Sequence, residues 1–120
     1  MEKNSPKIKV TQENGVTIVE LLAEEILDEG TISTISESLF AVVEDHAPVQ
    51  LLLSFERVKH LSSSALGTLI RLNKRIDETG GKLRLCKIKK NLYEIFTITK
   101  LNKLFDIFED RETAIKSFVR

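Results

Sequence analysis

Three consecutive serines, Ser62-Ser63-Ser64, are the side chains of this chain that are best placed to do chemistry. They precede an apolar segment of helical period, so they are predicted to lie at a helix start. A helix N-terminus has unpaired backbone N–H groups and a positive partial charge, both of which stabilise a phosphate dianion. A serine there can be phosphorylated without melting the helix, and its charge would change which protein docks nearby. The cluster is therefore a candidate phosphorylation switch, in which one of the three serines would be modified.

Helix capping is the competing explanation for the serine cluster. Serine is among the best N-cap residues, and one capping hydroxyl stabilises a helix by about 1 kcal/mol. Capping accounts for one serine and not for three in a row. Gly67 is also unexplained, because glycine inside a helix costs about 1 kcal/mol relative to alanine. It indicates close packing, either of the helix on a neighbouring element or of a partner protein on the helix.

Catalytic and metal-binding patterns are missing from the sequence. His46, His60 and Cys86 are isolated from one another, and no CxxC, HxxxH or HExxH spacing occurs. Neither a glycine-rich phosphate loop nor a GxSxG nucleophile turn is present. Cys86 is predicted to be a buried apolar residue and not a nucleophile. We therefore expect a protein that is not an enzyme and has no catalytic residue, no metal site and no cofactor.

The composition is that of one soluble folded domain over residues 1–120, with 42% hydrophobic and 30% charged residues. Eighteen basic and eighteen acidic residues cancel, which argues against a nucleic-acid partner. The apolar runs are far shorter than the roughly 20 residues of a membrane span, and residues 1–6 lack an apolar signal region. We expect a cytoplasmic protein with no membrane insertion.

Alternating and helical periods predict the elements that position the serines. Residues 7–22 read as a β-hairpin turning at Asn14-Gly15, a pair that tolerates positive φ. A helix is predicted from an N-cap at Thr31 to near His46, and the apolar run 49–53 suits a central strand buried on both faces.

The second half of the chain repeats this alternation. A second helix follows the serines and ends at Gly80-Gly81, where Gly80 can take the left-handed C-cap conformation. Its predicted inner face consists of Leu66, Leu69, Ile70, Asn73 and Ile76. A strand at 83–86, a helix capped by Asn91, a strand at 105–108 and a helix capped by Asp110 complete the chain. The order predicts a single α/β domain with a mixed central β-sheet, opened by the N-terminal hairpin, and about four helices.

With this element order, the segment Ser62-Ser63-Ser64-Ala65-Leu66-Gly67 resembles the motif of the STAS domain family, the bacterial anti-sigma-factor antagonists. The family motif is Asp-Ser-Ser/Thr-Gly-Leu-Gly opening a helix after a buried strand and a loop. Residues 80–86 look like the family's Gly-Gly turn into its next strand, and residues 101–108 resemble the segment before its last strand. The resemblance covers about residues 8–118.

The resemblance implies a function and a set of residues. In the family, the unphosphorylated antagonist binds an anti-sigma factor with serine kinase activity, which releases the sigma factor. The kinase phosphorylates the first serine of the motif, and a serine phosphatase reverses this. That serine corresponds to Ser63, with Ser64 as the alternative, and Asp28 matches an aspartate near the family's phosphosite. The implied partner-binding residues are Asp28, Ser62, Ser63, Ser64, Leu66 and Gly67.

Two departures from the motif keep other interpretations open. The family's aspartate is Ser62 here, which removes a negative neighbour of the phosphosite, and its glycine is Ala65. The chain is therefore alternatively a non-phosphorylated STAS interaction or scaffold domain in a sulfate transporter-like or sensor complex. A phospho-aspartyl receiver or small enzyme is disfavoured, because the central strand ends in Ser54-Phe55-Glu56 without the acidic cluster that holds magnesium.

Overall fold

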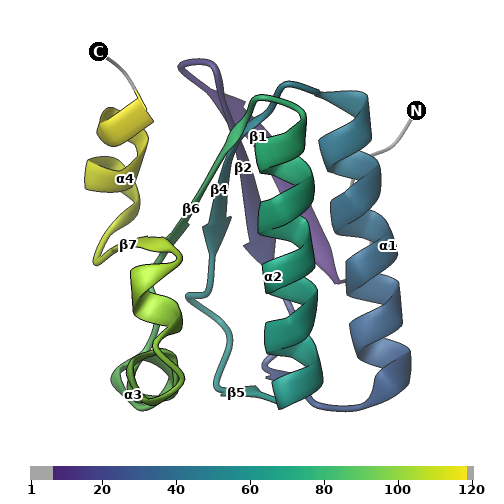
Figure 1. Cartoon of the computed structure of the whole chain (residues 1–120), viewed down its shortest axis with the longest axis vertical. Coiled ribbons are helices and arrows are strands. Elements are labelled where there is room, and N and C mark those ends of the chain that lie inside the picture. Colours follow the sequence, from purple (N-terminus) through teal and green to yellow (C-terminus); the bar gives the residue numbers. More distant parts are fainter. Residues whose placement is uncertain (1–6, 119–120) are drawn as a thin grey trace.

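In the computed structural model, which describes residues 7–118, helices cover both faces of a five-stranded sheet (Figure 1). The strand order is β1-β2-β4-β6-β7, with β1 antiparallel to β2 and the other neighbours parallel. The elements are β1 (Ile8–Glu13), β2 (Val16–Leu21), β3 (Glu25–Ile26), α1 (Glu29–Asp45), β4 (Gln50–Ser54), β5 (His60–Leu61), α2 (Ser63–Glu78), β6 (Lys82–Cys86), α3 (Lys90–Ile98), the 3-10 turn η1 (Leu101–Lys103), β7 (Asp106–Phe108) and α4 (Arg111–Phe118). The predicted α/β class, mixed sheet and four helices are confirmed.

The hairpin that opens the sheet turns where the sequence predicted. Asn14 and Gly15 have φ of 55° and 79°, and Glu13 pairs with Val16 across the turn. Positive φ at both central residues gives the turn a twist that matches the flanking strands. β2 then runs beside β4, so the hairpin is joined to the parallel part of the sheet.

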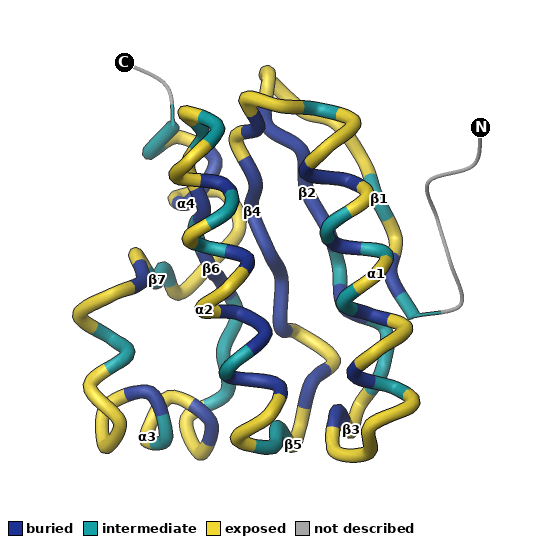
Figure 2. Tube along the Cα trace, turned by 45° about the vertical axis from the view of Figure 1, so that its right-hand side comes forward, coloured by how far each residue is buried: buried dark blue, intermediate teal, exposed yellow. Residues whose placement is uncertain are grey.

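β4 is the centre of the core, as Figure 2 shows by its dark blue trace. Leu51 and Leu53 lie in the larger hydrophobic cluster, with residues of α1 and α2, and Leu52 lies in a second cluster with residues of α4. All three leucines are fully buried. Because successive side chains of a strand point to opposite faces, a continuous apolar run is needed when helices cover both.

Local predictions at the helix ends were partly wrong. α1 begins at Glu29 with Asp28 as its N-cap, not at Thr31, whose own backbone N–H donates to the Asp28 carboxylate. α3 begins at Lys90, and the Asn91 side chain does not cap it but donates to the Lys59 carbonyl. The predicted Asp110 cap is confirmed by a 2.7 Å hydrogen bond from the Thr113 backbone N–H.

The predicted inner face of α2 was partly wrong, because the buried residues lie further to one side of the helix than predicted. Ile70 is 40% exposed and Asn73 is half-buried. Leu72, which was not predicted, is fully buried in the larger cluster, and Thr68 is buried as well. A helix with a wide apolar stripe can be rotated about its axis by some tens of degrees and still bury most of the stripe. The neighbouring elements therefore decide which edge of the stripe is covered.

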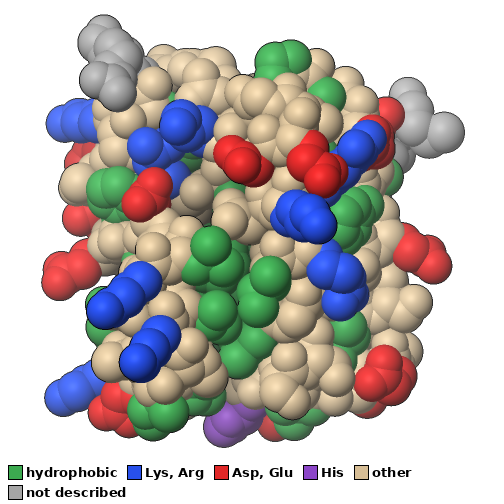
Figure 3. Space-filling view, in the orientation of Figure 1, with side chains coloured by type: hydrophobic (Ala, Val, Ile, Leu, Met, Phe, Trp, Pro, Cys, Tyr) green, Lys and Arg blue, Asp and Glu red, His purple; other side chains and the backbone are tan. Residues whose placement is uncertain are grey.

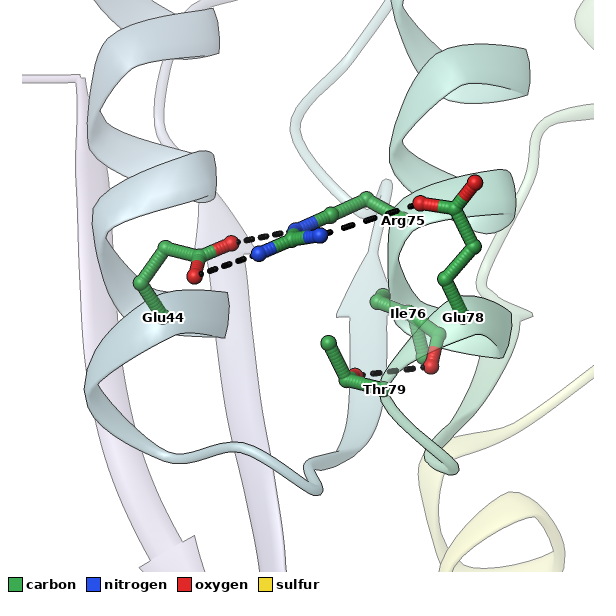
Figure 4. A network of polar contacts seen from close by, with 5 residues as sticks. All are labelled: Glu44, Arg75, Ile76, Glu78 and Thr79. Carbon is green, nitrogen blue, oxygen red and sulfur yellow. Dashed lines mark hydrogen bonds and ion pairs between the residues drawn. The ribbon is translucent and has the colours of Figure 1, made fainter.

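An ion-pair network ties the C-terminal halves of α1 and α2 together (Figure 4). The Arg75 guanidinium donates to both Glu44 carboxylate oxygens, at 2.6 and 2.9 Å, and lies 3.7 Å from Glu78. The hydrogen bonds from Arg75 lower the pKa of the Glu44 carboxyl, so the pair stays ionised at neutral pH. The two helices lie side by side with both N-termini at the same end of the molecule (Figure 1).

Candidate functional site

A two-stranded parallel ladder joins the starts of α1 and α2. Glu25 pairs with His60 and Ile26 with Leu61, and the Ser62 backbone N–H donates to the Ile26 carbonyl at 3.1 Å. Each of these short strands leads within two residues into a helix. Both Figure 1 and Figure 2 therefore show the N-terminal ends of α1 and α2 side by side. Their positive dipole ends face the same region of surface.

Asp28 is held at this surface as the N-cap of α1. One carboxylate oxygen accepts a hydrogen bond from the Thr31 backbone N–H at 3.0 Å, and the other accepts from the Thr31 hydroxyl at 2.7 Å. These hydrogen bonds lower the pKa of the carboxyl, so the exposed group is an anion at neutral pH. The predicted proximity of Asp28 to the serine cluster is consistent with the ladder that joins the two helix starts.

The three serines have different roles: one caps the helix, and the other two are exposed on the surface. Ser62 is the N-cap of α2, and its hydroxyl oxygen accepts a hydrogen bond from the Ala65 backbone N–H at 3.2 Å. Ser63 and Ser64 occupy the first turn of α2 and are exposed. Capping therefore explains Ser62 alone. The other two hydroxyls lie at the positive end of the helix, where another protein can reach them.

We expect Ser62→Ala to lower the free energy of unfolding by about 1 kcal/mol, because the Ala65 N–H loses its acceptor. Ser62→Asp should retain the cap and keep the wild-type stability, as aspartate is an equally good N-cap. Urea denaturation followed by circular dichroism measures both changes. Ser63→Ala is the matched control, expected within about 0.5 kcal/mol of wild type. A loss at Ser63 as large as that at Ser62 would contradict the assigned roles.

Leu66 and Gly67 occupy different environments one residue apart. Leu66 is 6% exposed and belongs to the core, where it anchors the first turns of α2. Gly67 is half-exposed, and a Cβ added there would meet nothing closer than the Arg71 Nη1 atom at 3.7 Å, an ordinary contact. No neighbouring element therefore needs a glycine at this position. Close packing of α2 on a neighbouring element therefore does not explain Gly67.

Exposed hydrophobic side chains occur on the helical face of the molecule. Figure 3 shows such side chains gathered beside α2 on the helical face. The large hydrophobic residues that are most exposed are Leu27, Ile70, Tyr93, Ile98 and Leu104. Leu27 directly precedes the Asp28 cap and Ile70 lies on α2. Apolar side chains grouped on a surface are typical of a protein-binding face.

The space behind the serine cluster is too small for a ligand. An apolar cavity of about 20 Å³ lies between α1 and α2, and Leu61, Ala65 and Thr68 form part of its wall. That volume holds about one water molecule, for which an apolar wall offers no hydrogen bonds. A small molecule therefore has no room between the two helices in this structure.

Sequence reasoning missed β3 and β5, the ladder that brings the site together. Two-residue strands are too short to show a period, so hydrophobic periodicity does not predict them. Within residues 7–118, the structure contains no helix with the length and apolarity needed to span a bilayer.

The fold and the motif agree with comparisons to known proteins. The chain is 23% identical over 109 residues to the anti-sigma F factor antagonist of Paenibacillus polymyxa, covering 91% of this chain and 92% of that protein. A STAS-domain anti-sigma-factor antagonist from Planctomyces limnophilus has the same fold, with a TM-score of 0.86, 23% identity, and coverage of 94% of this chain and 98% of that one. The phosphorylated form of Bacillus SpoIIAA gives a TM-score of 0.69 at 16% identity, covering 94% and 99%. The STAS domain model matches residues 7–114, and this chain belongs to the STAS domain family.

Proposed function

We propose that this chain is an anti-sigma-factor antagonist of the cytoplasm, and that the paired N-termini of α1 and α2 form its docking surface. The observation that carries the proposal is the exposure of Ser63 beside a serine that already caps the helix. Membership of the STAS family and the likeness to the Paenibacillus antagonist support it. The partner is an anti-sigma factor with serine kinase activity, and its sequestration frees a sigma factor.

Phosphorylation of Ser63 supplies the switch. A phosphoserine carries a charge of about −2 and would be stabilised by the backbone N–H groups and dipole at the start of α2. The fold would tolerate the modification, because Ser63 contributes no cap and is exposed. The charge would add to that of the Asp28 carboxylate at the same end of the molecule. A partner surface that accommodates a neutral hydroxyl would then face a concentrated negative charge.

Phosphate mapping tests this proposal directly. The protein is incubated with ATP and each anti-sigma factor with a serine-kinase domain that the source organism encodes, and the modified residue is located by mass spectrometry. We expect phosphate on Ser63, its loss in Ser63→Ala, and its retention in Ser64→Ala. Phosphate on Ser64 alone would move the switch by one residue. Absence of phosphate from both serines would favour the alternative of a non-phosphorylated STAS scaffold in a transporter or sensor complex.

Gly67 provides a test of the docking surface that does not depend on phosphate. We expect Gly67→Ala to raise the free energy of unfolding by about 1 kcal/mol, since alanine is the better helix former and its Cβ has room. The same methyl group should weaken binding of the anti-sigma partner, measured by isothermal titration calorimetry. Lys74 is exposed on α2, so Lys74→Ala is the control and should leave binding of the anti-sigma partner unchanged. A more stable variant that binds as wild type would exclude Gly67 from the interface.

A further inference from the structure

A second candidate site lies on the opposite face of the sheet. α4 packs against β4, β6 and β7 and leaves Lys9 and Thr11 of β1 exposed. Beside α4 is a cavity of about 310 Å³, which we call the sheet cavity. Its polar lining includes Lys9, Thr11, Ser54, Glu56, Lys87 and Arg111. The volume is at the lower end of the range of small-molecule sites, about 300–1,000 Å³.

The position of the sheet cavity is one that α/β proteins commonly use for ligands. Ser54 is the last residue of β4, and Lys87 directly follows β6. These two strands are parallel neighbours, so their carboxyl ends open on the same edge of the sheet. Ligands of open α/β sheets bind beyond the carboxyl ends of parallel strands.

Cationic side chains from three elements converge on the cavity. Lys9 comes from β1, Lys87 follows β6, and Arg111 is the first residue of α4. The hydroxyl of Ser54 contributes a neutral hydrogen-bonding group from a residue that is 6% exposed. Cations and hydroxyls brought together from distant parts of the sequence are the groups that bind carboxylates and phosphates.

Part of this charge is already neutralised within the protein. Arg111 forms an ion pair with Glu13 at 3.0 Å, and Glu20, which also lines the cavity, lies 3.5 Å from Arg57. Asp110 is close enough to Lys87 for that ammonium to help lower the pKa of its carboxyl, but it caps α4 through the Thr113 N–H.

Two of the cations have no such partner. Within residues 7–118, neither Lys9 nor Lys87 forms an ion pair. Their two positive charges face the carboxylate of Glu56 in the lining and that of Asp110 next to Lys87. The cavity therefore presents ammonium and carboxylate groups together, which suits a ligand that carries both an anionic group and a hydrogen-bond donor.

We infer that the sheet cavity binds a small organic anion, a carboxylate or a phosphate monoester, that also carries an amino or hydroxyl group. The anionic group binds the ammonium group of Lys87, with the Ser54 hydroxyl as a neutral partner, and Lys9 adds positive charge from β1. The amino or hydroxyl group donates to the Glu56 carboxylate. This site is separate from the serine surface and does not depend on the proposed function.

Titration of the full-length, ¹⁵N-labelled protein tests the inference at physiological ionic strength. O-phosphoethanolamine and β-alanine carry an amine with a phosphate and a carboxylate, respectively, and ethanolamine carries the amine alone. We expect saturable shifts for at least one of the two anions at the backbone amides of Lys9, Ser54, Lys87 and Arg111, and none for ethanolamine. The absence of saturable shifts for both anions, or shifts spread over many lysines, would overturn the inference.

Lys87 allows a charge-removing substitution that the backbone conformation favours. Its φ of 61° is in the left-handed region that favours glycine, so Lys87→Gly removes the ammonium while relaxing the backbone. We expect about tenfold weaker binding of the anion, the effect of losing one charged hydrogen bond. Lys100→Gly is the matched control, because Lys100 has φ of 64° and lies outside the cavity lining. Equal binding by the wild type and Lys87→Gly, or equal loss in the two variants, would overturn the assignment.

Discussion

A Ser63→Glu variant is expected to bind the anti-sigma partner at least about 100-fold more weakly than the wild-type protein. The carboxylate would stand where the exposed hydroxyl lies in the first turn of α2, and would enter the interface without a cation opposite it. An uncompensated charge in an interface costs about 2–5 kcal/mol, and about 2.7 kcal/mol corresponds to 100-fold in the dissociation constant. Isothermal titration calorimetry with the purified partner measures the change.

The stability of Ser63→Glu separates a binding defect from a folding defect. A carboxylate in the first turn of a helix interacts favourably with the dipole, so the urea midpoint should be equal to or above that of wild type. Ser63→Gln matches glutamate in size without its charge and should lose less than about tenfold in affinity. Ser64→Glu tests the neighbouring position. Wild-type affinity in Ser63→Glu would refute a charge switch at this residue.

Gly81→Ala is expected to lower the free energy of unfolding by at least about 3 kcal/mol, a large share of the roughly 5–15 kcal/mol of a small domain. A Cβ at this position would overlap the backbone carbonyl oxygen of Val49 and lie 2.9 Å from its backbone nitrogen. The Val49 carbonyl accepts from Lys82 N–H at 2.9 Å, and Gly81 N–H donates to the Ile76 carbonyl at 2.9 Å. Relief of the overlap would break these bonds at the junction of α2 and β6. Chemical denaturation measures the loss.

The adjacent glycine is the matched control, because its requirement is conformational and not steric. Gly80 has φ of +85°, which confirms the predicted left-handed helix end, and its nearest neighbour is the Pro48 Cβ at 3.9 Å. Gly80→Ala should therefore cost about 1–2 kcal/mol, the penalty of a left-handed backbone for alanine. Equal losses at the two positions would show that close packing of Gly81 on Val49 is not the source of the effect.

Features that depend on a few adjacent residues could be predicted before the structure was known. The hairpin at Asn14-Gly15 and a capping serine within residues 62–64 follow from local backbone and hydrogen-bonding preferences, and the structure assigns the cap to Ser62. The burial of β4 on both faces follows from its apolar run, because a strand exposed on one face would alternate. Exposure of Ser63 was required by the switch hypothesis, and the structure is consistent with it.

Features that depend on how distant segments pack could not be predicted in this way. The β3–β5 ladder places Asp28 and Ser62 at the same end of the molecule, although 34 positions separate them, and two-residue strands carry no periodic signal. The outward position of Ile70 and the convergence of Lys9, Lys87 and Arg111 are likewise results of three-dimensional packing. Local preferences set where each helix and strand begins and which side chain caps it. Which faces are covered, and which distant side chains share a surface, depends on the burial of apolar area over the whole chain.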